Sequence, residues 1–154
     1  MHLKLTLLTT ALSLFTTSLA APAPHGNPYT YVRFRQVTYD AGYDDANRTM
    51  EFVSCSNGRN GLMSRYGWQT QGEIPRFPYI GGTDMVEGWN STNCGTCWSV
   101  TFEGRTVFIL AIDRTRHGLN IARDAMDELT GGEAEKLGRV FAGIVRVPEH
   151  YCGL

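Results

Sequence analysis

Four cysteines in a chain of 154 residues constrain its fold more than any other feature. In an oxidising compartment an even number of cysteines indicates a disulfide framework, and four allow three pairings, which the residues alone leave open. The C-x-x-C spacing of Cys94 and Cys97 also occurs in redox and zinc motifs. Zinc needs a second ligand pair, and Cys55, Cys152 and the four histidines lack matching spacing. We therefore expect two structural disulfides, no metal and no cofactor.

The first twenty residues indicate that the chain enters such a compartment. Lys4 precedes an apolar run interrupted by Thr and Ser, and the run ends in a small-x-small pattern at Ser18-Leu19-Ala20. The run is shorter than a membrane span needs. We expect residues 1–20 to be a signal peptide, the Pro-rich residues 21–31 to be a flexible arm, and residues 32–154 to be one secreted, extracellular domain.

Alternating apolar and polar residues predict several strands in this domain. The pattern covers residues 32–39, 97–102 and 139–147, and residues 105–112 form a mostly apolar strand. The two residues Glu103 and Gly104 predict a tight hairpin turn between two of these strands.

The remaining segments predict short elements and long loops. Residues 49–54 are expected to be a further strand, residues 62–66 a helical turn, and residues 67–96 ordered loops. Apolar residues at helical spacing over 121–129 predict a helix with Asn120 as its N-cap. Five or six strands with one or two short helices predict a mainly β protein, a small β-barrel with inserted loops.

The composition limits the classes of function. Hydrophobic residues make up 42% and charged residues 19% of the chain, so it is too apolar to be disordered. The formal net charge of −1 argues against a dedicated nucleic-acid binder. No membrane-spanning segment is expected after the signal peptide.

Few residues suggest chemistry. No G-x-S-x-G occurs, and the histidines do not indicate a nucleophile site. Asp113, at the end of a predicted strand, is the most notable carboxylate, although such an Asp commonly only orders its own turn. Loop aromatics such as Trp68 and Trp89 could stack on sugar rings or serve ordinary packing. Asn47 and Asn90 begin N-x-S/T sequons and are candidate glycan acceptors.

Longer segments make the chain similar to the cerato-platanin family of secreted fungal proteins. The similarity runs from about Val37 to Leu154 and includes all four cysteines at family positions. The segments that carry it are Val37-Thr-Tyr-Asp40, Val53-Ser-Cys-Ser-Asn-Gly58, Tyr66-Gly-Trp-Gln-Thr-Gln-Gly-Glu-Ile-Pro-Arg-Phe-Pro-Tyr-Ile-Gly-Gly82, Gly88-Trp-Asn-Ser91, Cys94-Gly-Thr-Cys-Trp98, Ile112-Asp113, Gly118-Leu-Asn120, Asp124-Ala-Met-Asp-Glu-Leu-Thr-Gly131 and Cys152-Gly153.

This resemblance implies a double-ψ β-barrel like the first domain of expansins, with bridges Cys55–Cys94 and Cys97–Cys152. It implies a small protein of the fungal cell wall and medium that binds chitin or N-acetylglucosamine oligomers. Several members loosen cellulose without hydrolysis, and many elicit plant defence. The resemblance therefore implies an elicitor of plant defence or a virulence effector, with a plant cell-surface receptor as a further partner.

The expansin comparison also implies a binding site. Expansin barrels carry two acids in their groove; Asp113 matches the first, whereas Asn120 takes the place of the second. Hydrolysis with inversion requires two carboxyl groups, so the sequence favours binding over cleavage. We expect Asp113, Asn120, Tyr39 and the adjacent Thr38 to bind carbohydrate, with no catalytic residue. The alternatives are a weak glycan-cleaving enzyme and a surface-active, self-assembling coat protein.

Two segments depart from the family pattern. Members commonly carry Pro where this chain has Thr92, which completes the Asn90 sequon, and a glycan there would partly cover a nearby groove. Residues 147–151 are also unusual, which weakens any inference from the family about the C-terminal tail.

Overall fold

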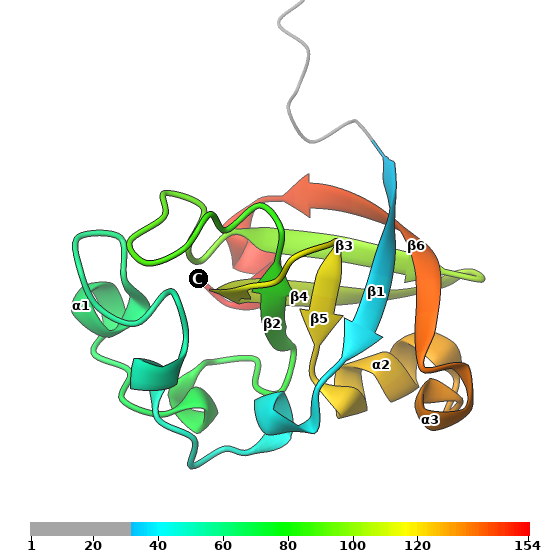
Figure 1. Cartoon of the computed structure of the whole chain (residues 1–154), viewed down its shortest axis with the longest axis horizontal. Helices are drawn as coiled ribbons and strands as arrows, with labels where there is room; N and C mark the ends of the chain where they lie inside the picture. The colour runs from blue at the N-terminus through cyan, green and yellow to red at the C-terminus, as the bar shows by residue number, and fades with distance from the viewer. Residues whose placement is uncertain (1–31) are drawn as a thin grey trace, which may run out of the picture.

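A closed barrel of six strands forms the centre of the molecule (Figure 1). The computed structural model describes residues 32–154, so the expected signal peptide and arm lie outside the described residues. The strands follow the order β1-β5-β2-β4-β3-β6 around the barrel. They are β1 (Arg33–Tyr39), β2 (Ile80–Thr83), β3 (Cys97–Phe102), β4 (Arg105–Arg114), β5 (Leu119–Ile121) and β6 (Arg139–Val147). The expected mainly β, double-ψ barrel is confirmed.

Short helices lie at the ends of the barrel and in its loops. The α-helices are α1 (Leu62–Tyr66), α2 (Arg123–Thr130) and α3 (Ala134–Leu137), and the 3-10 helices are η1 (Ala41–Asp44), η2 (Met50–Phe52), η3 (Gln71–Glu73) and η4 (Glu149–Cys152). Figure 1 shows α2 and α3 together at one end and α1 among long loops at the side.

The strand pairs combine both directions. β1 runs parallel to β5 and β2 parallel to β4, whereas the other pairs around the barrel are antiparallel. The β3–β4 hairpin turns at Glu103 and Gly104, whose φ angles of 46° and 80° are both positive, as a two-residue turn matched to the strand twist requires. The predicted hairpin is confirmed.

The core consists of the inward-facing strand residues, and two disulfide bonds connect segments around it. Val37, Ile80, Ile121 and Ile144 are completely buried. The two disulfides are Cys55–Cys94, which joins two loop segments, and Cys97–Cys152, which holds η4 against the start of β3. The pairing that the resemblance implied is confirmed.

Two predicted elements are wrong. Residues 49–54 form no strand; η2 occupies their centre, and Thr49 makes one isolated bridge to Thr70. Residues 67–96 are not all loop, because they contain the fully buried strand β2. A Cβ on Gly81 would lie 2.5 Å from the carbonyl oxygen of Asn120, so glycine is needed where the backbones of β2 and β5 approach.

Asn120 is not an N-cap. It lies within β5, and α2 begins at Arg123 with Ala122 at its N-cap, which provides no side-chain hydrogen bond. The carboxylate of Asp44 instead accepts the backbone amides of Arg123 at 2.8 Å and Asp124 at 3.0 Å. A residue about 80 positions earlier therefore caps the helix, which local sequence patterns cannot reveal.

Candidate functional site

One row of paired positions crosses four neighbouring strands on the outer face of the barrel. Thr38 on β1 pairs with Asn120 on β5, Asn120 pairs with Gly82 on β2, and Gly82 pairs with Asp113 on β4. Side chains at directly paired positions share one face of a sheet. The fold thus brings Thr38, Asn120 and Asp113 to one surface, with a glycine in the middle.

The glycine in this row makes room for a tyrosine from another element. A Cβ on Gly82 would lie 3.3 Å from the hydroxyl oxygen of Tyr43, a buried residue of η1. The Tyr43 hydroxyl reaches across this position and donates a hydrogen bond to Oδ2 of Asp113 at 3.1 Å. The absence of a side chain at position 82 of β2 therefore allows Tyr43 of η1 to contact Asp113 of β4.

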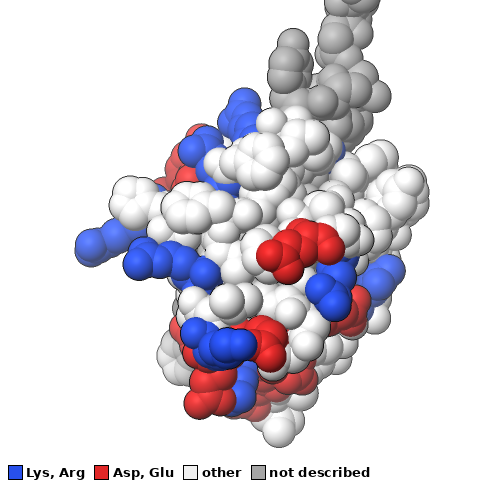
Figure 2. Space-filling view, turned by 90° about the vertical axis from the view of Figure 1, so that its right-hand side faces the viewer, with Lys and Arg blue, Asp and Glu red and all other residues white. Residues whose placement is uncertain are grey.

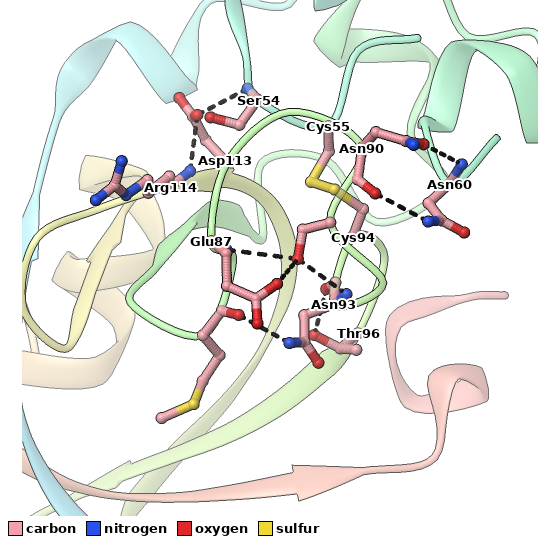
Figure 3. Close-up of a disulfide and its surroundings, with 12 residues drawn as sticks. Ser54, Cys55, Asn60, Glu87, Asn90, Asn93, Cys94, Thr96, Asp113 and Arg114 are labelled. Atoms are coloured by element: carbon pink, nitrogen blue, oxygen red, sulfur yellow. Dashed lines mark hydrogen bonds between the residues drawn. A yellow bond between two sulfur atoms is a disulfide. The ribbon is translucent and has the colours of Figure 1, made fainter. Parts of the chain in front are cut away.

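Asp113 is held in place by backbone amides as well. Its Oδ1 accepts hydrogen bonds from the amides of Ser54 at 2.8 Å and Arg114 at 2.7 Å (Figure 3). An ionised carboxylate has about four acceptor positions. Residues 32–154 occupy three of these positions, which leaves one position on Oδ2 for a hydroxyl donor.

Asn120 presents complementary groups at the other end of the row. Its Oδ1 accepts a hydrogen bond from the Thr38 hydroxyl at 2.9 Å, which fixes the orientation of the amide. Within residues 32–154 its Nδ2 group has no hydrogen-bond partner, so both N–H bonds remain free to donate. The half-buried row thus offers donors at Asn120 and an acceptor at Asp113.

The fold separates Tyr39 from this row. Tyr39 follows Thr38 on β1, so its side chain points to the opposite face of the strand. It pairs with Ile121 and packs against the buried core. The structure therefore does not place the Tyr39 ring beside Asp113 and Asn120, as the sequence led us to expect. Tyr43 is the tyrosine that contacts Asp113, and no sequence pattern linked it to that carboxylate.

The loop aromatics lie on other segments. Trp68 stacks on Tyr66 at the end of α1, with 4.5 Å between ring centroids. Trp89 is 66% exposed, and its Nε1 donates to Oδ1 of Asn57 at 2.8 Å. Neither residue belongs to the strands that carry the row.

The two sequon asparagines differ in their surroundings. Asn47 is exposed in the segment between η1 and η2. Asn90 is half-buried near the Cys55–Cys94 bridge, where its Oδ1 accepts the backbone amide of Asn60 and its carbonyl oxygen accepts Nδ2 of Asn60 (Figure 3). Its own Nδ2 has no partner among the described residues, so a glycan there would break neither bond.

Burial and the adjacent Asp113 carboxylate raise the pKa of Tyr43 above its usual value near 10. Deprotonation would bury a phenolate beside a carboxylate, so above about pH 10 the unfolded chain binds fewer protons than the folded one. The free energy of unfolding should therefore fall with rising pH in this range, by up to about 1.4 kcal/mol per pH unit for this group.

We expect Tyr43→Phe to show a shallower loss of stability between pH 10 and 11 than the wild type. Urea unfolding at pH 8, 10 and 11 measures this difference. If the free energy of unfolding of the two proteins fell equally with pH, the pKa of Tyr43 would not be raised and its contact with Asp113 would be weak.

In residues 32–154, no three His, Cys, Asp or Glu side chains come together in a group able to hold a metal ion. No helix in this part of the chain has both the length and the apolar character needed to cross a bilayer.

Comparison with known proteins identifies relatives over nearly the whole described region. The sequence model of the family described as Cerato-platanin matches residues 35–154. The chain is 43% identical over 151 residues to Allergen Asp f 15 of Aspergillus fumigatus, covering 97% of each chain.

Two solved structures resemble the fold. Cerato-platanin 2 from M. perniciosa superimposes with a TM-score of 0.75 and 40% identity, over 79% of this chain and 100% of that one. The solution structure of a protein described as the fungal elicitor Cerato-Platanin gives a TM-score of 0.68 and 41% identity, over 76% and 95%.

Proposed function

Because this chain belongs to the cerato-platanin family, we propose that it is a secreted, non-catalytic carbohydrate-binding protein. Its ligands are chitin or N-acetylglucosamine oligomers, and also cellulose, and it acts in an expansin-like way on cell walls. The observation that carries this proposal is the row in which the amide N–H groups of Asn120 and one acceptor position of Asp113, both without a partner in residues 32–154, share one half-buried surface.

The chemistry of the row suits a sugar with an N-acetyl group. Sugar hydroxyls both donate and accept, so they can use Asp113 and Asn120 together. The carbonyl oxygen of an N-acetyl group accepts from an amide such as Asn120 Nδ2. A hydroxyl bound to the ionised Asp113 forms a charge-assisted hydrogen bond, which is about twice as strong as a neutral one.

The same geometry supports binding without cleavage. Glycoside hydrolysis commonly uses two carboxyl groups, one that donates a proton and one that acts as base or nucleophile. The row has one carboxylate, Asp113, and it is held by three protein hydrogen bonds. Asn120 cannot donate a proton to a leaving glycoside oxygen.

We expect calorimetric titration of chitohexaose to show binding to the wild type, and Asn120→Ala to weaken it about fivefold to tenfold. The expected loss corresponds to the removal of one or two hydrogen bonds. In parallel incubations with chitin and cellulose, released reducing sugar should stay at the level of the buffer control. Sustained sugar release that Asp113→Asn abolishes would overturn the non-catalytic function. Binding unchanged by Asn120→Ala would remove the row from the site.

The wider role follows from the relatives. We propose that the protein acts outside the cell and in the fungal cell wall, and that a plant cell-surface receptor perceives it as an elicitor of defence. The solved relative described as a fungal elicitor supports this role. We further propose Asn47 and Asn90 as glycan acceptors, which mass spectrometry before and after enzymatic deglycosylation of the secreted protein can test.

A further inference from the structure

The outer face of β1 and β6 carries large apolar side chains that no other part of residues 32–154 covers. Phe34 is 75%, Phe141 66% and Val32 59% exposed. Soluble domains rarely group such residues without a partner. We call these three residues, with Gly143 and Val145, the phenyl ledge. Figure 2 views this side of the barrel and shows an uncharged area bordered by basic and acidic side chains.

The strand register places the two phenyl groups next to each other. Phe34 pairs with Gly143 and Gln36 with Phe141, so Phe34 and Phe141 occupy diagonal positions on one face. Diagonal neighbours in an antiparallel pair lie about 7–8 Å apart. Gly143 has no side chain, and a Cβ there would lie 3.0 Å from Cγ1 of Val32, so the glycine lets the Val32 side chain lie over β6 beside Phe34.

A cavity of about 360 Å³ lies on the Phe34 side of the ledge, and its lining includes polar groups. It is lined by Val32, Phe34, Thr101, Glu103, Gly143 and Val145. The Thr101 hydroxyl and the Glu103 carboxylate can form hydrogen bonds, whereas the other lining residues, Val32, Phe34, Gly143 and Val145, are apolar. Such a surface fits a ligand with apolar faces and a hydroxylated edge, as a sugar ring has.

The ledge is continuous with the row of Asp113, Asn120 and Thr38. Thr38 pairs with Arg139 on β6, two positions before Phe141, so Thr38 and Phe141 are also diagonal neighbours. Along β1, residues 34, 36 and 38 share the outer face. A chain bound at the row can therefore pass over Thr38 to Phe141 and then to Phe34 without leaving this face.

We propose that the phenyl ledge is an extended subsite on which the more distant residues of a bound N-acetylglucosamine chain stack. This rests on the proposed function, because the row must hold the first sugars. The apolar faces of successive sugar rings pack on Phe141 and Phe34, and their hydroxyls meet Thr101 and Glu103. The site thereby selects long chains over short ones.

The test compares ligand length in calorimetric titrations with chitotriose and chitohexaose. We expect the wild type to bind the hexaose about tenfold more tightly than the triose. The double variant Phe34→Ala/Phe141→Ala should lose this gain and keep its affinity for the triose, because exposed phenyl groups contribute little to folding. Leu137→Ala, which truncates a 43% exposed side chain on α3, is the matched control and should leave both affinities unchanged.

The outcomes separate this inference from the proposed function. If the wild type binds both lengths equally, or if the double variant keeps the length preference, the ledge is not a subsite, although the row can still bind sugar. If Asn120→Ala leaves triose binding unchanged, the row of Asp113, Asn120 and Thr38 is not the sugar-binding site, and the proposed function is contradicted. Sedimentation of the same variants reports self-association. A dimer that the phenyl substitutions dissociate, with sugar affinities unchanged, would assign the ledge to a second copy of this chain and overturn the proposal.

Discussion

Replacing Asp113 by alanine is expected to lower the free energy of unfolding by about 3 kcal/mol and the melting temperature by about 10 °C. The substitution removes three hydrogen bonds and leaves the amide of Ser54 and the hydroxyl of the buried Tyr43 without their acceptor. An unpaired buried polar group costs more than the net gain from a hydrogen bond. Thermal unfolding followed by circular dichroism measures this change.

Asp113→Asn separates the structural role of this residue from its role in binding. The carbonyl oxygen of the new side-chain amide can still accept hydrogen bonds from the backbone amides of Ser54 and Arg114. Its NH₂ group can donate to the Tyr43 hydroxyl oxygen. We therefore expect Asp113→Asn to unfold much closer to the wild type than Asp113→Ala does. Its affinity for chitotriose should fall about tenfold, because the charge-assisted hydrogen bond is lost. Equal affinities would exclude Asp113 from the site and leave Trp68 and Trp89 as the better candidates.

Removing the Cys55–Cys94 bridge by the double substitution Cys55→Ala/Cys94→Ala should lower the free energy of unfolding by about 4 kcal/mol. The bridge spans 39 residues, and a loop of this length gives that value in the chain-entropy description of disulfides. Urea unfolding measures the change. Thiol titration of the denatured wild type should find no free thiol, since all four cysteines are paired; two reactive thiols would mean that one bridge is absent.

The second disulfide provides a matched control for the effect on binding. Cys97–Cys152 spans 55 residues, so its removal should destabilise the protein by a similar amount. Cys55, however, directly follows Ser54, whose amide binds Asp113, whereas Cys152 holds the C-terminal helix η4. At a temperature where both variants are folded, only the loss of Cys55–Cys94 should weaken sugar binding. Equal losses in both variants would show that the bridge acts through global stability alone.

Local patterns were sufficient where an element depends on its own residues. The alternation in β1, β3 and β6, the Glu103-Gly104 turn and the helical turn at α1 all follow from side-chain periodicity and turn chemistry. These features depend on contacts within a few residues, so a single sequence carries them.

The elements that the sequence missed depend on contacts between distant residues. The four residues of β2 include two glycines and have little strand propensity of their own. They are extended because β4 and β5 pair with them on both sides. The start of α2 likewise depends on Asp44 and not on the adjacent Asn120.

The sequence by itself determined the disulfide-bonded β-barrel class and, through resemblance, the pairing of the cysteines and the candidates Thr38, Asn120 and Asp113. Only the tertiary structure decided which of these share a surface. Strand alternation turns Tyr39 toward the core, and the bare backbone of Gly82 lets Tyr43 reach Asp113. The tertiary structure also placed Phe34 and Phe141, which are about 107 positions apart, side by side on one face. Register between strands sets these neighbours, and register is a property of the closed barrel as a whole.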